Sequence, residues 1–111
     1  PERVALVDVG AAAVAATIVH DSVWRLSVTD SLLRTADSLG VGTPLGVLRA
    51  RAGWRALRGE GNLVVQLPGH CGLSFRLRPS PAAARAADAD AAVRRLPANT
   101  PVEEVFVVGC R

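Results

Sequence analysis

Lysine, methionine and tyrosine are absent from this chain of 111 residues, and only two cysteines occur. Two tryptophans and two phenylalanines are its only aromatic side chains, so we expect an aliphatic core. No apolar run approaches the roughly twenty residues that a transmembrane helix needs, and no transmembrane segment is expected. The chain opens at Pro1 without a basic and apolar leader, so any signal peptide is expected to have been removed or to lie outside this sequence.

Because lysine is absent, arginine supplies all 13 basic side chains and the net charge is +3. One interpretation is recognition of phosphate or carboxylate groups, which a guanidinium holds with two parallel hydrogen bonds. The other is a GC-rich coding sequence, which also accounts for the abundant alanine, glycine, proline and valine. Acidic residues are interspersed with the arginines and no basic run exceeds two residues, which favours the compositional interpretation.

The length fits one domain, residues 1–111, because two halves of this size would each bury too little surface to be stable. Half of the residues are hydrophobic, which is enough for a packed core. Strands are expected at 2–9, 17–19, 23–28, 54–58, 63–67, 72–78 and 101–110, where apolar and polar residues alternate or β-branched residues cluster. The sequence therefore predicts an α+β fold: a single antiparallel β-sheet of about five to seven strands with one short packed helix and one peripheral alanine-rich helix.

The short helix is predicted at Pro44–Ala52. The hydroxyl of Thr43 is expected to cap it, the proline suits a first helical turn, and Gly53 is suited to close it. Leu45 and Leu48 fall on one face and are expected to pack on the apolar face of the sheet.

The second helix is predicted between Pro81 and Arg95. Val93 and Leu96 are its only large apolar groups, so it is expected to be an exposed and mobile insertion between strands.

Cys71 and Cys110 each lie near the edge of a predicted strand. If those strands are neighbours, a disulfide closing about forty residues would contribute roughly 4 kcal/mol in the chain-entropy model. The alternative is two free thiols in a cytosolic protein, where cysteine is an ordinary small hydrophobic residue.

The pair His70–Cys71 suggests a thiolate activated by an imidazole. Adjacent residues of an extended chain point to opposite faces, however, and no aspartate or asparagine is placed by the sequence to orient the ring. His20 and the two cysteines also lack the paired spacing of a zinc site. We therefore assign no catalytic residue, no metal ligand and no cofactor.

Arg76 and Arg78 share one face of a predicted strand and are the candidates for an anion-binding patch. The curvature of the sheet could gather further arginines that are close in sequence: Arg49, Arg51, Arg55 and Arg58. Phe75 and Leu77 have the opposite parity, so the arginine face lacks the stacking aromatics of sheet-based nucleic-acid modules. A nucleic-acid partner is therefore not expected.

Three segments carry a family resemblance. The first reads RTADSLGVGTPL over residues 34–45 and continues to Gly53, the second reads GLSFRL over 72–77, and the third is the valine-rich end at 105–110. Together they resemble an uncharacterised family of small exported bacterial domains, with slight departures at 38–40 and 43–45. The stretch that enters the short helix is also similar to a turn in small lipoproteins of outer-membrane protein assembly and in β-lactamase-inhibitor-like domains.

The resemblance implies export, to the periplasm or out of the cell, and a helix packed on an antiparallel sheet; it brings no catalytic residues. We therefore expect a noncatalytic envelope or secreted domain that binds another protein or serves as a structural module. The alternative is a small-molecule or anion-binding protein, or an enzyme, that uses the arginines with His70 and Cys71.

Overall fold

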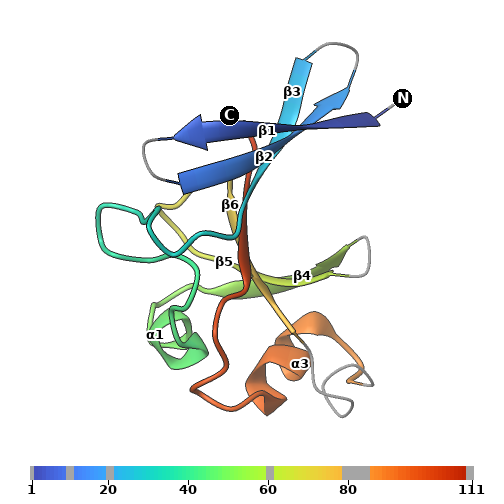
Figure 1. Cartoon of the computed structure of the whole chain (residues 1–111). Coiled ribbons are helices and arrows are strands. Elements are labelled where there is room, and N and C mark those ends of the chain that lie inside the picture. Colours follow the sequence, from blue (N-terminus) through green and yellow to red (C-terminus); the bar gives the residue numbers. More distant parts are fainter. Residues whose placement is uncertain (1, 10–11, 20–21, 60–61, 79–85, 110–111) are drawn as a thin grey trace.

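A strand lies at each of the predicted places, but the second begins earlier than predicted, at Ala12, and the last is shorter, Glu104–Val107 (Figure 1). The computed structural model describes residues 2–9, 12–19, 22–59, 62–78 and 86–109. Its strands are β1 (Glu2–Val9), β2 (Ala12–Val19), β3 (Ser22–Val28), β4 (Arg55–Gly59), β5 (Asn62–Gln66), β6 (Leu73–Leu77) and β7 (Glu104–Val107). Its helices are α1 (Leu45–Arg49) and α3 (Ala89–Arg95).

The predicted α+β fold is confirmed, because the strands form one antiparallel sheet in the order β1-β2-β3-β7-β6-β5-β4. β1 to β3 and β4 to β6 are two antiparallel meanders, and β7 lies between β3 and β6. Val105 of β7 is opposite Val28 on one side and Phe75 on the other. In Figure 1 the red end of the chain runs from the helices up to the amino-terminal strands. The last strand therefore joins the two meanders into one sheet.

The segment ahead of β7 binds the segment that leads into α1. The backbone N–H of Gly42 donates to the carbonyl oxygen of Val102 (2.8 Å), and that of Val102 donates to the carbonyl oxygen of Thr43 (2.9 Å). The N–H of Leu45 donates to the carbonyl oxygen of Thr100 (2.8 Å). These bonds hold the start of α1 close to the centre of the sheet.

Both helices pack on one face of the sheet. Leu45 and Leu48 of α1 and Val93 of α3 are fully buried there, so the predicted packing of the two leucines is confirmed. Strand residues of a single parity complete this core: Leu63, Val65, Phe75, Leu77 and Val105.

The opposite face of the sheet has no described helix over it, and we call it the helix-free face. It includes strand residues of the other parity, with Val108 directly after β7: Arg55, Leu57, Val64, Gln66, Ser74, Arg76, Glu104 and Phe106.

The helix α1 is shorter than predicted, and Thr43 does not cap it. The residue before the helix is Pro44, and the Thr43 hydroxyl instead accepts a hydrogen bond from the backbone N–H of Gly40 (3.0 Å). Gly53 ends the turn after the helix with a φ of 80°, and a Cβ there would lie 2.8 Å from Cγ of Pro68. Glycine is therefore needed at this position for both its conformation and its small size.

The alanine-rich helix lies at the β4 edge of the sheet, but the predicted exposure of its last turns is wrong. Ala92 and Val93 are fully buried and Leu96 is nearly so. Small alanine side chains let the helix approach the sheet closely, and Arg49 binds the carbonyl oxygens of Val93 and Leu96 at its end (3.1 and 3.0 Å). Residues 79–85, the first part of the predicted insertion, lie outside the described residues.

The carboxylate of Asp90 in α3 closes the β4 edge. Its Oδ1 accepts a hydrogen bond from the backbone N–H of Ala56 (2.9 Å), a group that an edge strand otherwise leaves to solvent. Arg58 of the same strand donates to the carbonyl oxygen of Ala86 (3.1 Å). The helix is therefore bonded to the edge as well as packed on the core face.

We predict that Leu48→Ala lowers the free energy of unfolding by about 2–5 kcal/mol, because the side chain is fully buried. Val47→Ala is a matched control, since Val47 is the preceding residue of α1 and is 42% exposed. The measurement is urea unfolding of both variants and the wild type. Equal midpoints for Leu48→Ala and wild type would contradict the packing.

Candidate functional site

The loop that precedes α1 is held in shape by Arg34. Its Nη1 donates to the carbonyl oxygen of Ser38 (2.9 Å), and its Nη2 donates to that of Val41 (3.1 Å). Ser38 has a φ of 68°, which is uncommon for a residue other than glycine. A Cβ at Gly40 would lie 2.8 Å from the carbonyl oxygen of Leu33. The stretch that carries the family resemblance is therefore a tightly folded loop.

Asp37, at the tip of this loop, gathers three partners. Its carboxylate accepts hydrogen bonds from the hydroxyl of Thr35, from Nη1 of Arg51 (2.8 Å) and from Nε2 of His70 (2.9 Å). The bond from Thr35 first, and then those from Arg51 and His70, hold the pKa of this carboxyl well below its ordinary value. The loop, the end of α1 and the turn after β5 are thereby joined at one carboxylate.

The ring of His70 is fixed by acceptors on both sides. Its Nε2 faces Asp37, and its Nδ1 lies 3.3 Å from the carbonyl oxygen of Pro68. A doubly protonated ring satisfies both acceptors, whereas a neutral ring satisfies one. Asp37 is thus an orienting carboxylate that the sequence did not place. Both ring nitrogens are engaged away from Cys71, so the ring is not positioned as a base for that sulfur.

Cys71 follows His70 in the same turn. The structure assigns no free thiol to Cys71. Cys110 lies outside the described residues, so its pairing with Cys71 stays a prediction. The adjoining backbone is favourable, because the N–H of Val108 donates to the carbonyl oxygen of Gly72 (2.9 Å). The ends of the chain segments that carry the two cysteines are therefore neighbours.

Arg76 and Arg78 lie on the strand face that was predicted, and both face carboxylates. Arg76 binds Glu104 through Nε (2.8 Å) and Glu103 through Nη1 (3.4 Å). Arg78 binds Glu103 through Nε (3.1 Å), with its side chain 80% exposed. An anion at this patch would have to compete with the two glutamates.

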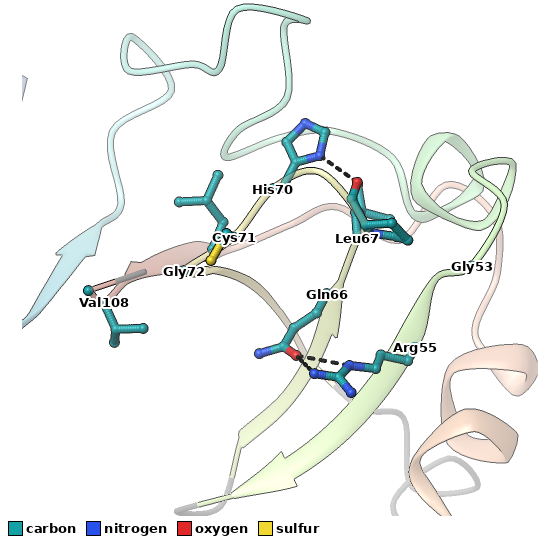
Figure 2. A pocket seen from close by; sticks show the side chains of 11 residues that line it. Gly53, Arg55, Gln66, Leu67, His70, Cys71, Gly72 and Val108 are labelled. Carbon is teal, nitrogen blue, oxygen red and sulfur yellow. Dashed lines mark hydrogen bonds between the residues drawn. The ribbon is translucent and has the colours of Figure 1, made fainter. Parts of the chain in front are cut away.

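An open groove of about 490 Å³ lies at the end of the sheet where β4 and β6 begin and where β5 and β7 end (Figure 2). It is lined by Gly53, Arg55, Gln66, and the stretches 67–68, 70–73 and 108–109. We call it the Arg55 groove. None of its lining residues is acidic, and polar and apolar surface contribute about equally to its walls.

Arg55 is held in this groove by a row of polar side chains on the helix-free face. Nε and Nη2 of Arg55 both donate to Oε1 of Gln66 (3.2 and 3.0 Å), as Figure 2 shows. Nε2 of Gln66 in turn donates to Oγ of Ser74 (3.0 Å). Arg55 and Gln66 are directly opposite each other in the ladder between β4 and β5. Three neighbouring strands therefore orient one guanidinium.

A second, shallower hollow of about 270 Å³ adjoins the Arg55 groove on the helix-free face. The two hollows share Gln66 and Val108 as lining residues. Phe106 lies in the second hollow with the guanidinium carbon of Arg25 4.5 Å from its ring centre. The hollows together form an extended depression over the strands.

The sequence analysis did not find Arg55 as a site residue. A usable signal existed, because a hairpin closed at residues 59–62 puts Arg55 opposite Gln66. No comparable signal exists for Asp37 and His70, which come from loops far apart in the chain. In the described part of the chain, no three His, Cys, Asp or Glu side chains gather where a metal ion could bind.

No family model matches the chain, and no curated protein sequence matches it. Among solved structures the chain is similar to the crystal structure of the uncharacterized protein yfeY from Escherichia coli, with a TM-score of 0.56 and 16% identity. The match covers 98% of this chain and 82% of that one. At this identity the similarity shows the fold alone. No described helix is long and apolar enough to cross a membrane.

We predict that the Asp37 contacts stabilise the protein at neutral pH and are lost in acid. Because the folded pKa of Asp37 lies below its ordinary value of 3.8, the stabilisation is complete above that value and falls as the pH drops below it. Asp37→Asn should therefore lower stability at about pH 6 and flatten the decline below about pH 4. Asp30→Asn is the control, since within the described ranges the Asp30 carboxylate accepts one hydrogen bond, from the N–H of Leu32. Urea midpoints against pH measure the effect; parallel curves for wild type and Asp37→Asn would contradict it.

We predict a disulfide between Cys71 and Cys110 in the natively isolated protein. Its unreduced mass should be about two daltons below that of the reduced protein, because pairing two thiols releases two hydrogens. The double variant Cys71→Ser/Cys110→Ser should unfold at a lower urea concentration, with roughly 4 kcal/mol as the upper limit of the loss. Alkylation of two thiols before reduction would rule the bridge out.

Proposed function

We propose that this chain is a noncatalytic envelope or secreted domain of a bacterium that binds another protein through the helix-free face of its sheet. Support for export comes from the family resemblance and from the neighbouring ends of the segments that carry Cys71 and Cys110. A small domain with few aromatic side chains gains from a covalent cross-link, and such links persist in oxidising compartments.

The observation that carries the proposal is the extended depression on this face. Val108 and Leu57 line it and are 40% and 41% exposed, which is high for large apolar side chains. Phe106 and Val64 also line it but are largely buried, so Leu57 and Val108 supply most of its exposed apolar surface. An open depression with exposed apolar walls suits an extended segment of a partner better than an enclosed small molecule.

The alternative, an enzyme or small-ligand binder built on His70 and Cys71, has less support. Both nitrogens of His70 are held by acceptors, and neither acceptor is the sulfur of Cys71. The arginines of the other candidate patch, Arg76 and Arg78, are bound to glutamates. The arrangement therefore supports binding of another protein over catalysis.

Val108→Asp tests the proposal, because it places a charge in the middle of the shared wall of the two hollows. Val47→Asp is the matched control, since Val47 is 42% exposed on α1, away from both hollows. Tagged wild type and both variants would be incubated with envelope extract of the source bacterium after mild cross-linking. We expect one protein to be retained by the wild type and Val47→Asp and lost with Val108→Asp.

A protein retained equally by all three baits would contradict the use of this face. Turnover of substrate by the purified domain, with loss of activity in His70→Ala and unaltered folding, would replace the proposal by the enzymatic alternative.

A further inference from the structure

We infer that the Arg55 groove receives a carboxylate of the partner protein, carried on an apolar extended segment, and that Arg55 binds it. This inference rests on the proposed function and identifies the chemistry of the partner at the same surface.

The first ground is the charge of Arg55. Among the described residues, its only hydrogen-bond partner is the neutral amide oxygen of Gln66, and no carboxylate pairs with it. Arg51 and Arg76, by contrast, face carboxylates. Two of the five N–H groups of Arg55 are used, which leaves three for a ligand.

The second ground is preorganisation. Gln66 fixes the guanidinium plane and is itself fixed by Ser74, so little side-chain freedom is lost when a ligand binds. A glutamate at position 66 would have the same shape and would neutralise Arg55. The amide orients the guanidinium without cancelling its charge.

The third ground is the lining of the groove. No acidic side chain lines it, and the carboxylate of Asp37, which bonds to the lining residue His70, is paired with that ring and with Arg51. Leu67, Pro68, Leu73 and Val108 supply apolar walls beside the charged group. A single guanidinium with two parallel donors matches a planar monoanionic carboxylate, whereas a phosphate dianion is usually held by several cationic or backbone donors. The groove therefore fits a carboxylate next to apolar side chains.

Three short peptides test this chemistry on the intact chain. The first is acetyl-Ala-Val-Val with a free terminal carboxylate, the second is the same peptide as its amide, and the third is acetyl-Ala-Val-Glu-amide. Binding is followed by NMR titration of the backbone amides of Gly53, Gly72 and Val108, which line the groove. Saturable shifts with the first peptide identify a terminal carboxylate as the ligand, and shifts with the third identify an acidic side chain. Neither should occur with the amide.

Arg55→Gln and Gln66→Glu should each weaken binding of the carboxylate peptide by about tenfold or more, since each removes one charge-assisted contact. Arg95→Gln removes the same charge from the exposed end of α3 and should change the affinity by less than about twofold. Gln66→Glu retains Arg55 and the folded shape, so its effect isolates the charge.

Equal affinity of the free acid and the amide, or unchanged affinity in Arg55→Gln, would overturn the inference. Its failure is distinguishable from failure of the proposed function. If Arg55→Gln still captures the protein that Val108→Asp loses, the proposed binding face is supported and the proposed carboxylate contact is contradicted.

Discussion

The insertion of β7 between β3 and β6 is the constraint on which the rest of the structure depends. Without β7, the backbone groups of β3 and β6 that bond to it would have no partner, and the sheet would separate into two meanders. The segment that leads into β7 also binds the segment entering α1, so the helix is positioned by the same strand. Val108 and Gly109, which directly follow this strand, line the Arg55 groove. The core, the helix α1 and the groove therefore all depend on the pairing of β7 with β3 and β6.

Local features of the sequence predicted the strands and helices of this fold. They did not predict the contacts between residues that are far apart in the chain. The alternation in 63–67 and 72–78 gave strands with the correct buried parity, because that signal depends only on neighbouring residues. Thr43 resembles a helix cap, yet its hydroxyl bonds to Gly40, since the loop folds back on itself. The burial of Ala92 could not be read from its size, because alanine offers little apolar surface until another element approaches closely. Asp37 and His70 lie in two loops that are far apart in the sequence, and no local sequence pattern predicts that they meet.

The abundance of arginine has a structural explanation beyond base composition. Arg34 and Arg49 each bind several backbone carbonyl oxygens, which closes a loop in one case and joins two helices in the other. Arg25 stacks on Phe106 and Arg94 lies over the ring of Trp54. A planar group with five donors is suited to these roles, and lysine is not. The guanidinium groups compensate in part for a core with few large side chains.

The bond between Asp90 and Ala56 has a consequence for how copies of this sheet could associate. An added strand at β4 would have to displace the carboxylate and α3 with it, whereas β1 has β2 as its only described neighbour in the sheet. Strand addition is thus open at one end of the sheet and blocked at the other. Two copies that paired through their β1 edges would leave neither copy with an open edge. Association of this kind therefore stops at a dimer and does not propagate into a fibre.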